Sequence, residues 1–592
     1  MDREKIEECY KWDLSKIYSS IDDFRSDMQL VKEKMNDFNK YKDMTYDENT
    51  LYEVISLYME TSSILNKLDV YTSLLSDEDT GINKNRELKE EVSNLSSEFI
   101  SKTYFIEPNI LKIGYNLIEG YYKKNEKLLE YKRYLYKLYR YKEHMLSDSE
   151  EKLLANLSKV FGNNYETYEL MKDSDMVFPN FVVDNKDYEL NNSNYSIYIE
   201  DDNRNIRKGA FDTLYETFKQ YKNVYANLIT SNIKEEVSIS KIKKYKSALE
   251  SATYHDEIDE SIYNNLIDVI NNKMEILHKY YDLKKEVLEL DELHLYDVYA
   301  NLVLEDRKEY DFESSKETVI NALSILGDEY IGILKKGIED RWIDVYPNKR
   351  KRTGGYSSGC YDTNPYILLN YQNKYDDMST LAHELGHSMH SYYTRKNNPY
   401  QYGHYSIFVA EVASTVNELI LAKYVIRTSN NKNEKLFILN RLMELFRATI
   451  YRQTMFAEFE KKIYEMIEED KPVSADTLSK EYYKLNEVYF GKNVVVDDYI
   501  RYEWARIPHF YYNFYVYKYA TGLSAASYIV NGLLDGTIKK EDYIKFLKCG
   551  DSKSPLESLK VAGVDLSKKE VLISATEMFN SIIDEFREIY FK

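Results

Sequence analysis

The sequence predicts a mainly α-helical protein with at least two lobes, and three observations support this prediction. The chain has 592 residues, far more than one simple domain needs. Only eight of them are proline, the residue that interrupts helices. Apolar residues recur at helical spacing over long stretches such as 51–75 and 260–290, with charged residues between them.

A few short strands are expected within this helical background. Five segments have strand-like composition: 176–184, 195–199, 293–299, 342–346 and 364–371. Near residue 200 the strand-like sequence ends and long helical patterns begin. We therefore predict an N-terminal helical lobe over 1–200 and a second, catalytic region over 201–592.

Composition limits the function classes. The net charge of −20 argues against a general nucleic-acid binder, because phosphate binding needs a positive face. Cys9, Cys360 and Cys549 lie far apart without a C-x-x-C pair, which suits reduced thiols in the cytoplasm. No apolar run approaches the roughly 18 residues of a membrane helix, and the first residues lack a secretory signal. We expect a cytoplasmic protein without nucleic-acid or membrane partners.

Two basic stretches each allow two interpretations. Segment 131–142 interleaves tyrosines with Lys and Arg, so a stacking surface for nucleic acid is one of them. An amphipathic helix whose cations extend into solvent is favoured. Segment 348–352, "NKRKR", could bind phosphate, but it adjoins a glycine turn. A loop that leads into a strand is favoured there.

The stretch "LAHELGHSMH" carries the chemistry, with three of the nine histidines within 381–390. His383, Glu384 and His387 form the pattern H-E-x-x-H. On a helix, positions i and i+4 share a face about 6 Å apart, so two imidazoles can bind one zinc ion tetrahedrally. Glu384 is turned by about 100° from His383 and can take a proton from a zinc-bound water. Chance predicts only about 0.02 matches to this pattern, so two unrelated helix histidines are a weak alternative.

Two details surround this motif. Ser379 or Thr380 is expected to cap the helix that carries it. His390 shares the helix face of His383 but lies about 10 Å along the axis. We expect His390 in the core or behind a ligand rather than on the metal.

A catalytic zinc needs a third protein ligand and an open position. One peptidase class would place a histidine six residues after His387, but Tyr393 stands there. The other solution is a glutamate from a second helix, and segment 406–426 has a helical pattern. Glu411 lies there among small and apolar residues, where an acid is costly to bury unless it binds something. We predict Glu411 as the third ligand; a solvent-facing glutamate is the alternative.

A second cluster, "RIPHFYYNFYVYKYATG" at 506–522, combines a histidine with many phenols. Fixed donors aimed at a carbonyl oxygen that gains negative charge lower the barrier of peptide hydrolysis. A helix that begins after Pro508 could supply such donors. The alternative is a tyrosine-rich helix that packs against the core. Spacing alone leaves five candidates open: Tyr511, Tyr512, Tyr515, Tyr517 and Tyr519.

Four motifs together resemble the M3 family of zinc oligopeptidases, specifically its oligoendopeptidase F branch. They are "KRTGGYSSGCYDTNPYILLNY", "HELGHSMH", "SIFVAEVAST" and the tyrosine-rich stretch above. "WDLSKIY" at 12–18 and "LESLKVAGVDL" at 556–566 are similar to that branch as well. The resemblance spans nearly the whole chain.

The resemblance implies a two-lobed gluzincin peptidase with a deep channel and a small β-sheet near the active site. One zinc ion per chain would be held by His383, His387 and Glu411, with Glu384 as the general base. The transition-state residues of the family fall on His509, Tyr512 and Tyr519.

The same resemblance assigns substrate binding to 354–358, which includes Gly354, Gly355 and Tyr356. Glycines permit close approach, and an edge strand offers sequence-tolerant main-chain bonds. Two positions depart from the family pattern: Gly355 stands where alanine is common, and His404 where an acid is expected.

The function implied is a zinc metalloendopeptidase that hydrolyses internal bonds of short peptides. A non-catalytic peptide-binding protein that keeps the fold is the alternative, and the intact Glu384 disfavours it. A nucleic-acid binder is a third hypothesis, which the net charge opposes.

Overall fold

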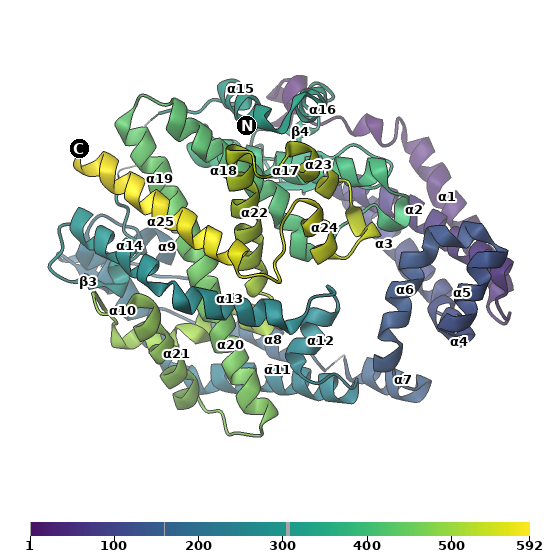
Figure 1. The fold of residues 1–592 in the computed structure, drawn as a ribbon, viewed down its shortest axis with the longest axis horizontal. Helices are drawn as coiled ribbons and strands as arrows, with labels where there is room; N and C mark the ends of the chain where they lie inside the picture. Colours follow the sequence, from purple (N-terminus) through teal and green to yellow (C-terminus); the bar gives the residue numbers. More distant parts are fainter. Residues whose placement is uncertain (1, 159, 304–307) are drawn as a thin grey trace. The chain divides into compact units, whose positions relative to one another are not determined.

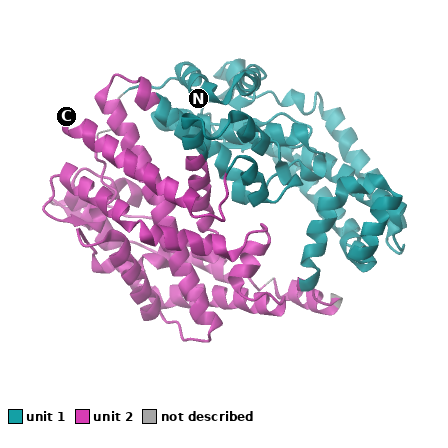
Figure 2. Cartoon of the chain, in the orientation of Figure 1, with its two compact units in different colours: residues 1–143, 308–424, 529–563 teal, residues 144–307, 425–528, 564–592 magenta. Residues whose placement is uncertain are grey.

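The computed structural model describes residues 2–158, 160–303 and 308–592, and most of them are helical as predicted (Figure 1). The chain divides into two compact units, each assembled from three segments (Figure 2). Unit 1 consists of Met1–Glu143, Lys308–Tyr424 and Ile529–Gly563. Unit 2 consists of His144–Arg307, Val425–Tyr528 and Val564–Lys592. The predicted boundary near residue 200 stays a prediction.

Unit 1 is built around the long helix α2, which contacts α1, α3 and α5. Its N-terminus is capped by Asp47, whose carboxylate accepts hydrogen bonds from the backbone N–H groups of Asn49 and Thr50. The helices of this unit are α1 (Ile21–Asp37), α2 (Glu48–Glu78), α3 (Asn83–Thr103), α4 (Ile106–Ile113), α5 (Tyr115–Lys124), α6 (Lys132–Arg140), α15 (Phe312–Leu323), α16 (Asp328–Glu339), α17 (Tyr375–Asn397), most of α18 (Ile407–Thr428), α23 (Lys540–Leu547) and α24 (Pro555–Val561).

A small sheet in unit 1 lies against α17. Its order is β4 (Ile343–Asp344), β6 (Tyr366–Leu368), β5 (Tyr356–Ser358). The central strand β6 is fully buried, pairs parallel with β4 and antiparallel with β5, and contacts α17 together with β5. Strands were predicted at 342–346 and 364–371, and both predictions are confirmed. The segment 354–358 supplies the edge strand of the sheet.

Both basic stretches adopt the favoured conformation. Segment 348–352 is a loop before β5, and its Lys351 is buried on the equally buried Asp344, with 2.6 Å between Nζ and Oδ1. Segment 131–142 forms α6 with short flanking 3-10 turns, and Leu135 is buried. Lys137 pairs with Asp551 at 2.7 Å. Lys132 and Lys142 are exposed as expected, whereas Lys137 binds an acid of the same unit instead of extending into solvent.

Unit 2 is a second helical assembly in which α25 packs on α13, α14 and α19. Its helices are α7 (Asp148–Leu157), α8 (Asn163–Leu170), α9 (Tyr195–Ile199), α10 (Arg204–Gln220), α11 (Lys222–Ile242), α12 (Ala248–Tyr254), α13 (Glu260–Asn272), α14 (Met274–Val287), α19 (Lys432–Phe446), α20 (Arg452–Glu468), α21 (Ala475–Phe490), the first part of α22 (Tyr517–Asp535) and α25 (Glu570–Phe591).

Two strand pairs also belong to unit 2. Strands β1 (Phe181–Val183) and β2 (Lys186–Tyr188) form a hairpin whose turn, Asp184 and Asn185, has positive φ at both residues, as a type I′ turn requires. Strands β3 (Leu293–His294) and β7 (Val494–Val495) pair in parallel. The strands predicted within 176–184 and 293–299 are confirmed, although both are short.

The strand predicted at 195–199 is wrong, because this segment forms helix α9. Tyr195 and Ile199 are buried, whereas Ile197 is 66% exposed. Burial at i and i+4 is the helical pattern, and a strand would have buried all three side chains on one face. Asn191 accepts hydrogen bonds from the N–H groups of Ser193 and Asn194, which turns the chain into the helix.

Among the described residues, no helix combines the length and the apolar character needed to cross a lipid bilayer.

Candidate metal centre and active site

Helix α17 carries the H-E-x-x-H motif in unit 1, but it begins earlier than predicted. The Asp377 carboxylate accepts hydrogen bonds from the N–H groups of Gln372 at 2.8 Å and Lys374 at 2.9 Å, and the helix starts at Tyr375. The predicted caps at Ser379 or Thr380 are therefore wrong. Thr380 lies inside the helix, where its hydroxyl donates to the Asp376 carbonyl.

Helix α18 approaches α17 at Gly386, the glycine inside the motif. A Cβ built on Gly386 would lie only 2.5 Å from the Ser414 Cα and 2.7 Å from the Ala413 carbonyl oxygen. The buried Asn417 side chain donates a hydrogen bond of 3.1 Å to the Ala382 carbonyl of α17. Because only glycine allows this approach, the motif itself determines how near Glu411 on α18 comes to the two histidines.

The three predicted ligands meet at one point. The Nε2 atoms of His383 and His387 lie 3.1 Å apart, and Glu411 Oε2 lies 3.4 Å and 3.5 Å from them. A tetrahedral zinc ion with bonds of about 2.0–2.1 Å holds its ligand atoms about 3.3 Å apart. The triangle matches that spacing on every edge. Two imidazoles and one carboxylate are also a donor set typical of catalytic zinc, so these residues fit the ion.

Glu418, two turns after Glu411 on α18, contacts the His383 ring on the side away from the candidate metal position. Its carboxylate contacts His383 Nδ1, which leaves Nε2 free to point at the metal position. Burial would lower the pKa of His383, but hydrogen bonds with Glu411 and Glu418 outweigh it and raise that pKa to about 10. This contact of Glu418 was not predicted. The signal was its spacing of seven residues from Glu411, which puts both acids on one helix face.

Glu384 lies next to this centre and is only 6% exposed. Burial raises the pKa of its carboxyl, while the neighbouring His383 and His387 oppose that shift. A buried carboxylate whose proton affinity is increased is suited to accept a proton from a reacting group.

His390 lies in the core, as predicted. It is 1% exposed, and its ring stacks on Tyr405 with 3.7 Å between centroids and 2° between planes. Burial lowers its pKa to about 3, so the ring is neutral. His390 does not belong to the cluster of candidate metal ligands found among the described residues.

The glycine segment forms the free edge of the sheet beside α17. Gly354 has a φ of +86°, and a Cβ on Gly355 would lie 3.1 Å from the Thr380 methyl group. Tyr356 begins β5, and its hydroxyl donates to Asp77 at 2.7 Å. Strand β5 thus runs directly along α17, the helix that carries two of the three candidate metal ligands.

The remaining predicted residues, His509, Tyr512 and Tyr519, belong to unit 2. His509 Nε2 lies 3.3 Å from the Tyr519 hydroxyl, and the Tyr512 hydroxyl lies 2.7 Å from that of Tyr165. The structure brings His509 and Tyr519 into contact, and Tyr512 is 41% exposed. Burial lowers the pKa of His509.

The helix predicted to begin after Pro508 is wrong. A 3-10 turn spans Pro508–Tyr511, Asn513 and Phe514 both have positive φ, and α22 begins only at Tyr517. The Phe514 N–H donates to Glu460 at 2.8 Å. The Asn513 side chain accepts from the Tyr464 hydroxyl and donates to Glu236. These contacts hold two residues in a conformation that costs about 1–3 kcal/mol each, and they separate Tyr512 from α22.

We expect Gly386→Ala to weaken metal binding by at least about tenfold. The added methyl group must push α18 away from α17, which overpacks the contact and moves Glu411. Zinc affinity measured with a competing chelator checks this result. Gly332→Ala on α16 is the matched control, because a Cβ there meets nothing within 4 Å. Equal zinc affinity for wild type and Gly386→Ala would contradict the role given to the glycine.

Comparison with known proteins assigns the chain to a family. The model of peptidase family M3 matches residues 197–578, and a model described as Oligopeptidase F matches residues 109–178. The first match covers more than half of the chain. The chain belongs to peptidase family M3. Membership makes it a metalloendopeptidase, as the resemblance implied.

Curated relatives from family M3 match over the full length. Oligopeptidase PepF of Bacillus subtilis is 41% identical across 100% of this chain and 89% of its own. Group B oligopeptidase PepB of Streptococcus agalactiae is 36% identical across 100% and 98%.

Solved structures agree with the helical M3 fold. A crystal structure of a Chlamydophila abortus peptidase matches with a TM-score of 0.95 and 34% identity over 99% of both chains. Oligoendopeptidase-F of Enterococcus faecium matches with a TM-score of 0.73 and 31% identity over 96% and 99%. The predicted family and the mainly helical fold with a small sheet are confirmed.

Proposed function

We propose that this chain is a zinc-dependent endopeptidase that cleaves internal bonds of short peptides at the centre formed by His383, His387 and Glu411. The observation that carries the proposal is the triangle of ligand atoms with edges of 3.1, 3.4 and 3.5 Å. Relatives named oligopeptidases support short peptides as the substrate class.

Residues of the chain have separate roles in the proposed hydrolysis. A bound zinc ion would act as a Lewis acid that polarises the substrate carbonyl and makes water a stronger nucleophile at neutral pH. Glu384 accepts the proton of the attacking water and then delivers it to the nitrogen of the leaving amine. Glu418 keeps His383 in the tautomer whose Nε2 faces the metal position.

The edge strand β5 positions the substrate. A peptide that adds to this edge is bound through its main chain, and main-chain bonds tolerate many side chains. Gly354 and Gly355 keep that edge free of side chains at the start of the strand. We assign Gly354, Gly355 and Tyr356 to substrate binding on this ground.

We extend the proposal to His509, Tyr512 and Tyr519 as donors to the carbonyl oxygen that becomes negative in the transition state. Polar groups of this kind contribute most when they are fixed before the reaction begins. The contact between His509 and Tyr519, and the anchored turn at Asn513 and Phe514, support that requirement. The two lobes, the channel, a cytoplasmic location and the lack of nucleic-acid partners stay predictions.

Tyr512→Phe is expected to lower turnover by roughly 10²–10³-fold, because the lost hydroxyl would bind the oxyanion mainly in the transition state. KM should change much less. Steady-state kinetics on one peptide measure both. Tyr165→Phe is the matched control, since it removes the same 2.7 Å hydrogen bond from the other side. Equal losses in both variants would make Tyr512 a structural residue.

The function itself is tested by mass spectrometry of the products from unstructured peptides of about ten residues. We expect cleavage inside the peptide, with no stepwise loss from either end, and inhibition by a zinc chelator that added zinc reverses. Tight binding of intact peptide without any products would favour the non-catalytic alternative.

A further inference from the structure

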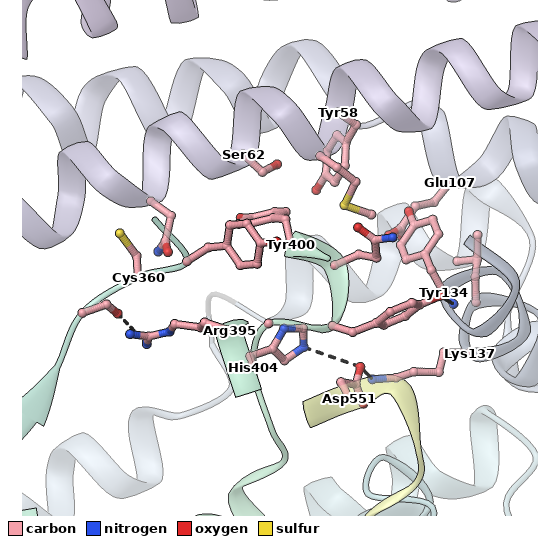
Figure 3. A pocket seen from close by; sticks show the side chains of 18 of the residues that line it. Tyr58, Ser62, Glu107, Tyr134, Lys137, Cys360, Arg395, Tyr400, His404 and Asp551 are labelled. Atoms are coloured by element: carbon pink, nitrogen blue, oxygen red, sulfur yellow. Dashed lines mark hydrogen bonds and ion pairs between the residues drawn. The ribbon is translucent and has the colours of Figure 1, made fainter. Parts of the chain in front are cut away.

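A cavity of about 710 Å³ lies within unit 1, beyond the end of β5. Its walls come from α2, α6, the C-terminal part of α17 and the turn at Tyr400–Tyr402 (Figure 3). Tyr58, Tyr134 and Tyr400 line it together with Cys360, Arg395 and His404. None of these residues has a role in the reaction described above.

Arg395 is the unusual member of this wall. Its Nη2 donates a 2.8 Å hydrogen bond to the Gly359 carbonyl, but its Nη1 is buried and has no hydrogen-bond partner among the described residues. Over the described part of the chain, no carboxylate lies within 4 Å of its guanidinium. Burial lowers the pKa of Arg395, which means that its positive charge is poorly stabilised. A buried cation with free donors is costly unless an anion joins it.

The acids in the same cavity do not fill this role. Asp551 is neutralised by Lys137, with 2.7 Å between Oδ2 and Nζ, and Arg133 lies 3.7 Å from its other oxygen. Glu107 lies on the opposite side of the cavity from Arg395 (Figure 3). The guanidinium therefore remains available to a ligand that brings its own negative charge.

Gly359 has no side chain and therefore leaves room for the Arg395 guanidinium. A Cβ at this position would lie 2.9 Å from Arg395 Nη1 and 2.8 Å from the Asn364 carbonyl oxygen. Its φ of +133° also disfavours any other residue. Gly359 directly follows Ser358, the last residue of β5, so the edge strand leads to Arg395.

Strand β5 and helix α17 run in the same direction from the metal centre to this cavity. Gly355 packs on Thr380 before the motif, the Ser357 hydroxyl lies 2.8 Å from that of Ser388 just after it, and Gly359 reaches Arg395. His387 and Arg395 are eight helical residues, about 12 Å, apart. That is the length of three to four residues of extended peptide.

We infer that Arg395 binds a carboxylate of a peptide that pairs with the outer edge of β5, three to four residues from the scissile bond. This inference rests on the proposed function, because it needs the peptide on that edge. A peptide parallel to β5 would present its C-terminal carboxylate. A peptide antiparallel to β5 would present an acidic side chain on the N-terminal side of the cleaved bond. A guanidinium binds either group through two parallel hydrogen bonds.

Three peptides with one scissile bond separate these sources. The parent has an amidated C-terminus and glutamine at the third and fourth positions before the bond. The second peptide has a free C-terminal acid three or four residues after the bond, and the third has glutamate in place of each glutamine. We expect one acidic peptide to exceed the parent in kcat/KM by roughly 10- to 100-fold with wild-type protein. The acidic peptide whose kcat/KM rises above that of the parent identifies the source of the carboxylate.

Arg395→Met should reduce that advantage to about onefold, and Arg395→Lys should keep only part of it. Lys396→Met, the exposed neighbour, is the control and should keep the full advantage. If Arg395→Met does not fold, the kcat/KM advantage of the acidic peptide is measured with Arg395→Lys instead, and a partial loss of that advantage supports the inference. The inference is overturned if neither acidic peptide gains over the parent, or if the gain survives in folded Arg395→Met. Failure of the proposed function would appear as no hydrolysis of any peptide. In that case, calorimetry with the same peptides still measures whether Arg395 strengthens binding of the acidic ones.

Discussion

Glu384→Gln should abolish most peptide hydrolysis while the protein keeps its zinc and its fold. The amide has nearly the shape of the carboxylate but cannot accept the proton of the attacking water, so turnover should fall by about 10²–10⁴-fold. Glu384 is 6% exposed and is not one of the clustered ligand residues, so zinc content should not change. Because burial disfavours its charged form, the neutral amide should not lower the melting temperature.

The measurements are kcat on one peptide and zinc per chain by mass spectrometry. Glu434→Gln on α19 is a suitable control, since Glu434 is similarly buried at 3% exposure but lies in unit 2, remote in sequence from the motif. Its turnover should stay near that of wild type. If Glu384→Gln kept wild-type turnover, another group would have to be the base.

His387→Ala should lose both zinc and activity. The substitution removes one corner of the triangle, and the two remaining ligands cannot hold the ion at micromolar free zinc. Wild-type protein should gain thermal stability as zinc is added, because the ion binds only the folded state. The variant should show no such gain. His390→Gln, on the same helix but outside the triangle, should retain zinc.

Zinc content and melting temperature with and without added zinc give the result directly. One zinc ion per chain in purified His387→Ala, equal to wild type, would mean that the site lies elsewhere. Loss of zinc in His390→Gln with retained folding would mean that the triangle is incomplete.

The candidate metal site could be predicted from sequence because most of its geometry is local. His383 and His387 are fixed by one turn of helix, and Glu411 stood out as an acid in an apolar helix. The same logic applied to Glu418 would have suggested its contact with His383. Strands β4 and β6 of the small sheet were found for a similar reason, since both are short runs of buried residues before the motif. The edge strand β5 is only half-buried, and its segment was expected from the family resemblance.

Other features depend on distant parts of the chain. The left-handed pair Asn513 and Phe514 is held by Glu460 and Tyr464 of α20, and phenylalanine with positive φ has no local signal. Composition suggested a strand at 195–199, but Tyr195 and Ile199 are buried with helical spacing in α9. The unpaired donor of Arg395 has no signal in the sequence either, because it depends on which hydrogen-bond acceptors the folded chain brings near the buried guanidinium.

The proposed reaction requires one zinc ion bound by His383, His387 and Glu411. An anomalous difference map from crystals of the protein, with data collected on both sides of the zinc absorption edge, tests it most directly. We predict one strong peak that is present only above the edge, within about 2.0–2.2 Å of the two Nε2 atoms and a Glu411 oxygen. A map from active protein with no peak at this position, or with its only peak at other residues, would show that these three residues do not hold the catalytic zinc ion.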